Sequence, residues 1–238
     1  MITTVLFDMD GTLLPVDYDE FVRAYFGLLC KKAAPHGYDP KTLADAVWKG
    51  TAAMVANNGM RSNETVFWET FAQIFGPESL GDKAMFDDFY KNEYQGARAV
   101  CGCEPAAARL VHDLKAAGIR TVLATNPIFP AEGINSRIRW AGIEPEEFAL
   151  VTTYENSRHC KPNPAYYRDI LDDLGLAPQE CVMVGNDAQE DMAAAELGIP
   201  VFLLTEYLLH GECVDLDTVP HGGWDDLRRW LSGLGIGI

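Results

Sequence analysis

The sequence predicts an α/β fold, a doubly wound parallel sheet interrupted by an all-helical insertion. Three observations lead to this prediction. A short apolar, β-branched run occupies residues 2–7, and the stretch from about 17 to 98 carries helical periodicity without a convincing strand. From about residue 104 onward, strand patterns and helix patterns alternate. Repeated strand–helix units of this kind form parallel sheets with helices on both faces.

The first expected strand, residues 2–7, leads directly into Asp8-Met9-Asp10 and a Gly-Thr turn. In an open α/β sheet, a buried parallel strand delivers such residues to its carboxyl end, where ligands bind. At strand spacing Asp8 and Asp10 would share one face, and their repulsion is unfavourable unless a cation lies between them. The alternative is a solvated acidic loop, and the later strand ends decide between the two.

The insertion is expected to contain several amphipathic helices. Apolar side chains recur at helical spacing in four stripes, at about 21–29, 43–54, 66–74 and 85–90. Breaks that contain Gly or Pro separate these stripes. We therefore expect a helical subdomain at residues 16–99 and one core domain formed by residues 1–15 and 100–238.

The core is expected to continue as further helix–strand units and a closing helix. The expected helices span about 104–117, 132–141, 163–174, 190–197 and 224–231, and the expected strands span about 120–125, 148–151, 181–185 and 201–204. Together with the amino-terminal strand, these strands would form a single parallel sheet.

Two strand ends in the core carry polar residues suited to an anion. One ends in Thr125-Asn126, where a hydroxyl and a backbone amide are available as donors, although such a stretch is often just a turn. Lys161 follows the next strand, and Pro162 and Pro164 restrict the backbone after it. An isolated lysine is usually a solvated surface charge, whereas a lysine fixed beside carboxylates can hold a phosphoryl oxygen and offset their charge.

A further strand end delivers a second group of polar and acidic residues, Asn186, Asp187 and Asp191. An Asp at the start of a helix can be simply a helix cap. Capping does not explain why these acids fall at the same sheet edge as the first acidic pair. Oxygen-rich sites dominated by carboxylates suit Mg²⁺, which keeps several waters and takes few protein ligands.

Taken together, these stretches resemble the four motifs of the haloacid dehalogenase (HAD) superfamily of hydrolases, in the same order. The matching segments are Phe7-Asp8-Met9-Asp10-Gly11-Thr12, Thr125-Asn126, Lys161-Pro162 and the segment from Gly185 to Asp191. The resemblance covers the core domain and implies a Rossmann-like fold whose helical insertion is a cap of the first type (C1). It also implies a Mg²⁺-dependent phosphatase that hydrolyses a small phosphorylated metabolite through an aspartyl-phosphate.

The resemblance implies roles for the two acids of the first motif. Asp8 would attack phosphorus, which splits hydrolysis into two easier displacements. Asp10 would protonate the leaving oxygen and then deprotonate the attacking water. Because the dehalogenase branch of the family lacks an acid at the position of Asp10, the resemblance favours phosphoryl transfer over carbon–halogen cleavage.

The other matched residues are implied to bind metal or phosphate. Mg²⁺ would be held by Asp8, the backbone carbonyl of Asp10, and Asp187. The phosphoryl oxygens would be bound by Thr125, the backbone amides of Met9 and Asn126, and Lys161. Asp191 would orient Lys161 or a metal-bound water.

One position departs from the family pattern. The family commonly has Asp directly after the glycine of the fourth motif, whereas this chain has Asn186 there and Asp187 next. Either Asn186 supplies an amide oxygen to the metal, or the turn is one residue longer and Asp187 points inward. An anionic ligand holds the metal better, which favours Asp187.

The break at residues 57–63, between two helical stripes, is the candidate specificity loop. Arg61 in this loop could meet a second anionic group of the substrate. The alternative is an exposed turn with a solvated arginine. The loop sequence alone does not identify a substrate.

The composition limits the partners and the compartment. A net charge of -16 argues against nucleic acid or an anionic membrane as a partner, and a local cation and a metal would have to overcome it for an anionic substrate. No apolar stretch approaches the roughly 20 residues that span a bilayer, and the amino terminus lacks the basic region of a signal peptide. The scattered cysteines fit reduced thiols, so we expect a cytoplasmic protein. The oligomeric state stays open.

Two alternatives to the phosphatase are kept. A phosphomutase or another phosphotransferase of the family would leave the phosphoryl group on an organic product. A catalytically silent member of the fold would bind a ligand or partner without turnover. The silent alternative predicts loss of Asp8, Asp10 or Lys161, and all three are present.

Overall fold

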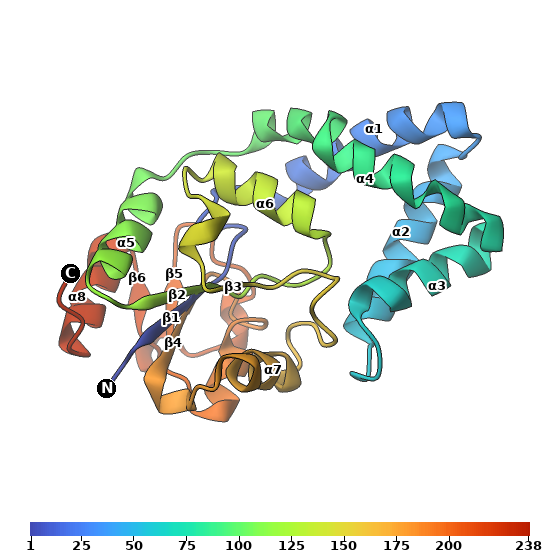
Figure 1. Cartoon of the computed structure of the whole chain (residues 1–238). Helices are drawn as coiled ribbons and strands as arrows, with labels where there is room; N and C mark the ends of the chain where they lie inside the picture. The colour runs from blue at the N-terminus through green and yellow to red at the C-terminus, as the bar shows by residue number, and fades with distance from the viewer.

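The computed structural model describes all residues from Met1 to Ile238. Six strands form one parallel sheet in the order β3-β2-β1-β4-β5-β6 (Figure 1). Their bounds are β1 Thr4–Phe7, β2 Arg120–Leu123, β3 Leu150–Val151, β4 Cys181–Gly185, β5 Val201–Leu204 and β6 His221–Gly222. The strand order reverses between β1 and β4, which is where open sheets of this type bind ligands.

The segment between β1 and residue 105 contains helices and no strand, and we call residues 18–100 the helical unit. Its α-helices are α1 Tyr18–Ala33, α2 Pro40–Val55, α3 Asn63–Phe75 and α4 Lys83–Lys91, and its 3-10 segments are Ala34–His36, Pro77–Asp82 and Glu93–Val100. The side chains of Asp17, Asp39 and Ser62 each accept a hydrogen bond from a backbone amide three residues on, which starts α1, α2 and α3. Figure 1 shows these helices gathered to the right of the sheet.

The remaining helices cover both faces of the sheet. Their bounds are α5 Pro105–Ala116, α6 Ala131–Trp140, α7 Pro164–Leu174 and α8 Trp224–Gly233. Val5 and Phe7 of β1 belong to an apolar cluster with residues of α5, α6 and α8, whereas Leu6 belongs to a second cluster with residues of α7. Since successive strand side chains point to opposite faces, the sheet is doubly wound, and the predicted fold class is confirmed.

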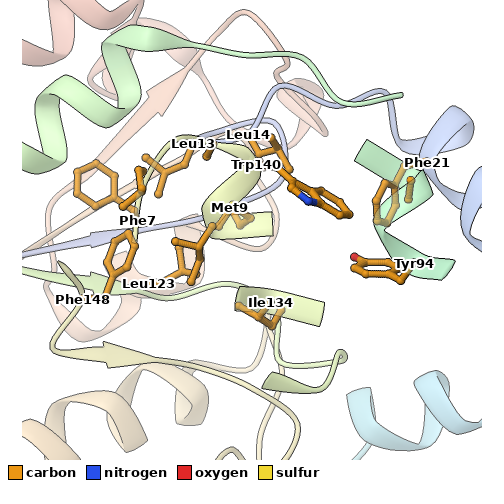
Figure 2. Packing of buried hydrophobic residues seen from close by; sticks show 14 of the residues in the cluster. Phe7, Met9, Leu13, Leu14, Phe21, Tyr94, Leu123, Ile134, Trp140 and Phe148 are labelled. Atoms are coloured by element: carbon orange, nitrogen blue, oxygen red, sulfur yellow. The ribbon is translucent and has the colours of Figure 1, made fainter. Parts of the chain in front are cut away.

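The larger apolar cluster is continuous from the sheet into the helical unit (Figure 2). Trp140 at the end of α6 packs against Tyr94, with ring centroids 5.2 Å apart. Tyr94 in turn meets Phe21 of α1 edge-on at 6.3 Å. Aromatic pairs of this kind contribute about 0.5–1.5 kcal/mol each beyond the burial of apolar area. The helical unit is therefore packed onto the core, not only linked to it.

Some expected elements differ in the structure. The helix expected at 190–197 is a turn followed by the 3-10 segment Met192–Leu197, and the strand expected at 148–151 is only Leu150–Val151. The strand β6 was not expected, because two residues are too short to display alternation. The division into domains at residues 15 and 99 stays a prediction. No helix of the chain combines the length and the apolar character needed to cross a membrane.

Candidate active site

A cavity of about 850 Å³ lies where the helical unit faces the carboxyl ends of β1, β2 and β4. It is lined by the predicted site residues Asp8, Asp10, Thr125, Asn126, Asn186 and Asp187. These residues follow three strands that are neighbours in the sheet. Parallel strands present their carboxyl ends at one edge, so residues far apart in the sequence meet there.

Asp8 is fixed by a buried ion-pair network. The ammonium group of Lys161 donates to Oδ1 of Asp8 and to Oδ1 of Asp191, at 2.7 Å in each case. The side chains of Lys161 and Asp191 are fully buried. Burial alone would lower the pKa of Lys161, but the charges of Asp191 and Asp8 raise it well above its ordinary value. The lysine is therefore a permanent cation that holds the Asp8 carboxylate in one position.

Lys161 does not line the cavity itself, because it lies beside Asp8 in the protein interior. Asp191 is buried and does not line the cavity either, and its Oδ2 accepts a hydrogen bond from the backbone amide of Asp187 at 3.0 Å. A glycine at position 185 permits this arrangement, since a Cβ there would collide with the Asp191 carboxylate. The predicted role of Asp191 in orienting Lys161 fits these contacts.

Asp10 forms an ion pair that the sequence did not predict. A guanidinium nitrogen of Arg137, on α6, donates to Oδ2 of Asp10. Arg137 is only 1% exposed, and its guanidinium lies over the ring of Phe129 at 4.3 Å. Two of its nitrogens and Oδ1 of Asp10 are buried without a partner. The available signal was a charged residue among the buried apolar positions Ile134 and Ile138 of α6.

Asn186 and Asp187 differ in the hydrogen bonds of their side chains. The amide oxygen of Asn186 accepts from the Thr12 hydroxyl at 2.9 Å, and its amide nitrogen donates to the carbonyl of Tyr207 at 2.7 Å. Both ends of the Asn186 side chain thus have protein partners. Oδ1 of Asp187 accepts from the backbone amides of residues 189 and 190 and pairs with Nδ1 of His210. Its Oδ2 carries no hydrogen bond and is available to a ligand.

Thr125 and Asn126 lie at the end of β2, as expected. The Thr125 carbonyl accepts hydrogen bonds from the hydroxyls of Tyr166 and Thr152, both at 2.8 Å, which fix this strand end. The Asn126 side chain donates to Oε1 of Glu190 at 2.8 Å, and its own Oδ1 is buried without a partner. Burial raises the pKa of Glu190 to about 7. Glu190 lines the cavity and was not predicted as a site residue.

Neither Met9 nor Arg61 lines the cavity. The Met9 side chain is fully buried in the apolar core (Figure 2), so only its backbone could serve the site, as predicted. Arg61 is brought to neither the cavity nor the other site residues. Its side chain is 54% exposed, ion-paired with Glu69, and lines a separate pocket of about 290 Å³. Arg61 therefore lies outside the cavity, and we do not assign it the expected role in contacting the substrate.

The loop around Arg61 serves as a contact between the helical unit and the core. The buried side chain of Asn63 donates to the carbonyl of Pro127 at 3.2 Å. The backbone amide of Asn63 donates to the carbonyl of Ser157 at 2.8 Å. Because the loop is turned toward these core residues, its arginine projects to the outside instead of into the cavity.

A family comparison accounts for this constellation. Residues 2–198 match the model of the haloacid dehalogenase-like hydrolase family. The chain belongs to this family. The predicted family and the prediction of a hydrolase are therefore confirmed.

The relatives of this hydrolase include enzymes with different names. A phosphoglycolate phosphatase of Vibrio vulnificus is 26% identical over 214 residues, covering 89% of this chain and 87% of its own. The crystal structure of CbbY from Rhodobacter sphaeroides in complex with phosphate aligns with a TM-score of 0.59 and 20% identity, over 95% and 96% of the two chains. A 2-haloacid dehalogenase of Pseudomonas syringae aligns with a TM-score of 0.62 and 21% identity, over 97% and 100%. At such identities the two structures show a shared fold.

The cavity of the hydrolase has the donor chemistry of a magnesium site. Carboxylates of Asp8, Asp10, Asp187 and Glu190 line it, and burial raises the pKa of Asp8 to about 8 although Lys161 opposes this. A nearby cation would favour the ionised carboxylates. No three carboxylate, imidazole or thiolate side chains converge on one point. A bound Mg²⁺ would therefore also use a backbone carbonyl and waters, which is its usual habit. With all-oxygen donors, the residues fit this ion.

Proposed function

We propose that this hydrolase is a Mg²⁺-dependent phosphatase that cleaves phosphate monoesters of small metabolites through an aspartyl-phosphate on Asp8. The single observation that supports this most is the placement of Asp8. Its carboxylate lines the cavity, is fixed from behind by Lys161, and has the second acid, Asp10, lining the same cavity. A fixed nucleophile with a neighbouring acid–base group is the arrangement that covalent catalysis needs.

In the proposed reaction, a carboxylate oxygen of Asp8 attacks phosphorus while the ester P–O bond breaks. The electron pair of that bond passes to the leaving oxygen, which takes a proton from Asp10. Asp10 then removes a proton from water, the water attacks the phosphoryl group, and the Asp8 carboxylate is released with phosphate. Arg137 fixes the Asp10 side chain for both proton transfers.

Binding of the phosphoryl group is assigned to the hydroxyl of Thr125 and to the backbone amides of Met9 and Asn126. Mg²⁺ would be held by Asp8, the backbone carbonyl of Asp10, and Asp187, and would offset the charge between the anionic nucleophile and the anionic phosphate. Lys161 contributes a fixed positive charge beside Asp8. The predicted choice of Asp187 over Asn186 is supported by the free Oδ2 of Asp187.

The proposal is tested by assaying the purified chain with and without Mg²⁺ against an aryl phosphate and a panel of sugar phosphates, phosphoglycolate and nucleoside monophosphates. We expect inorganic phosphate to be released from at least one ester, only when Mg²⁺ is present. A phosphoryl group retained on a sugar product would instead indicate a phosphomutase. Absence of turnover on the whole panel would favour the catalytically silent alternative.

The choice of metal ligand gives a second prediction. Asp187→Ala is expected to raise the Mg²⁺ concentration for half-maximal activity by about tenfold or more, because an anionic ligand is lost. Asn186→Ala should mainly lower stability, by about 1–3 kcal/mol, since Thr12 and Tyr207 lose buried partners. Magnesium titration of activity and thermal unfolding of both variants check this. An Asp187→Ala variant with unchanged Mg²⁺ dependence contradicts the assignment.

A further inference from the structure

The part of the cavity formed by the helical unit is an aromatic wall. We define this wall by six residues from all four α-helices of the unit: Phe26, Trp48, Phe67, Trp68, Phe86 and Tyr90. Neighbouring rings pack closely, with centroids 5.6 Å apart for Phe26 and Trp48 and 5.4 Å apart for Trp68 and Phe86. Surfaces of this kind bind apolar groups by removing both partners from water.

Two polar tips of the aromatic wall, those of Tyr90 and Trp68, already have partners. The hydroxyl of Tyr90 is hydrogen-bonded to that of Tyr25 at 3.0 Å. The indole nitrogen of Trp68 donates to the hydroxyl of Tyr154 at 3.4 Å. A hydroxyl-rich ligand such as a sugar would gain no hydrogen bond from these two tips, and its hydroxyls would lose water where they lie against the rings.

The charges around the cavity disfavour a second anionic group on the ligand. Arg137 is the only lysine or arginine that lines the cavity, and it is paired with Asp10. Besides the predicted site residues and Glu190, four acidic residues line the cavity: Asp17, Asp19, Asp87 and Glu206. A carboxylate or second phosphate on the substrate would therefore meet mainly acidic side chains, because Arg137 is already ion-paired with Asp10 and His210 with Asp187. The cavity volume of about 850 Å³ is in the range that accommodates a drug-sized ligand.

We propose that the substrate is the monophosphate of an uncharged, mainly apolar alcohol, whose hydrocarbon part lies against the aromatic wall. This inference rests on the proposed phosphatase function and specifies its substrate class. Phosphoglycolate does not belong to this substrate class. Its carboxylate would need a cationic partner, and the only arginine that lines the cavity is already paired with Asp10. The phosphoryl group is bound at the sheet edge, and the leaving group extends toward α2 and α3.

The test compares kcat/KM of the Mg²⁺-loaded full chain for phenethyl phosphate, ethyl phosphate and phosphoglycolate. All three have aliphatic ester oxygens, so differences report mainly on recognition of the leaving group. We expect phenethyl phosphate to exceed ethyl phosphate by roughly 10- to 100-fold, with phosphoglycolate lowest. A kcat/KM for phosphoglycolate equal to or above that for phenethyl phosphate overturns the inference.

A pair of variants on α2 tests whether the aromatic wall causes the preference for phenethyl phosphate. Trp48, which is 43% exposed, lines the cavity, whereas Val55, also 43% exposed, does not. Trp48→Ala is expected to reduce the preference for phenethyl over ethyl phosphate by about tenfold, mainly through KM, whereas Val55→Ala should preserve it. An unchanged preference in the Trp48→Ala variant shows that the aromatic wall does not bind the leaving group.

A failure of the phosphatase proposal can be distinguished from a failure of the substrate assignment. If no ester is hydrolysed with Mg²⁺ present, the phosphatase proposal is wrong. The substrate assignment is then tested by measuring the binding of ligands to the cavity without turnover. Calorimetry would compare phenethylphosphonate with phosphonoacetate, two uncleaved analogues that differ in the apolar group and the carboxylate. Tighter binding of phenethylphosphonate supports the assigned ligand class, and equal or weaker binding overturns it.

Discussion

Replacing Asp8 by Asn is expected to lower kcat by at least roughly 10⁴-fold, because an amide oxygen is a poor nucleophile toward phosphorus. The fold should survive the change. Lys161 keeps Asp191 as a buried partner at 2.7 Å, and the new amide oxygen can still accept a hydrogen bond from the ammonium. Steady-state kinetics with Mg²⁺, together with circular dichroism of the variant, measure both effects.

The matched control for Asp8→Asn is Asp45→Asn. Asp45 lies on the exposed surface of α2, is paired there with Lys41, and does not line the cavity. The control should retain the kcat of the unmodified chain, since surface ion pairs contribute little even to stability. Substantial turnover by a well-folded Asp8→Asn variant would assign the nucleophile to another group.

Replacing Asp10 by Asn is expected to have the second largest effect, and one that depends on the leaving group. Loss of the general acid should slow the first turnover of an alkyl phosphate by about 10²–10⁴-fold. 4-Nitrophenyl phosphate needs little protonation of its leaving oxygen, so its first turnover should be much less affected. The second step still lacks its base, which predicts a rapid burst of nitrophenolate followed by slow turnover.

Stopped-flow measurement of nitrophenolate and quench-flow measurement of alcohol release test the role of Asp10. The burst amplitude should equal the concentration of active sites. Equal losses for both esters, without a burst, would contradict an acid–base role and indicate that Asp10 acts only through its backbone or through packing. The same experiment on Asp45→Asn provides the reference.

The strand ends of the candidate site could be predicted because they depend on local pattern and on one property of parallel sheets. Apolar runs fix β1, β2 and β4, and the carboxyl ends of neighbouring strands meet at one edge. The placement of Asp8, Thr125 and Asp187 along one cavity follows from these two facts. The helical insertion was predictable for a similar reason, since its apolar stripes keep a helical period throughout.

The contacts that the sequence did not reveal are those that depend on how helices pack onto the sheet. The pair of Arg137 with Asp10 joins residues 127 positions apart, and the packing of α6 onto the sheet beside β1 brings them together. The hydrogen bond from Asn126 to Glu190 was also not predicted, because it depends on the side-chain directions of two loops that follow β2 and β4. Arg61 was misplaced because the direction of its loop is set by the hydrogen bonds of Asn63 to the core, which no local pattern records.

The most direct test of covalent catalysis at the sheet edge is acid quenching of the Mg²⁺-loaded chain during turnover, followed by peptide mass spectrometry. The account predicts one phosphoryl group on the amino-terminal peptide, at Asp8, and a longer-lived modification in the Asp10→Asn variant. A phosphoryl group on a different residue, or rapid turnover with Asp8 unmodified in both proteins, would contradict it.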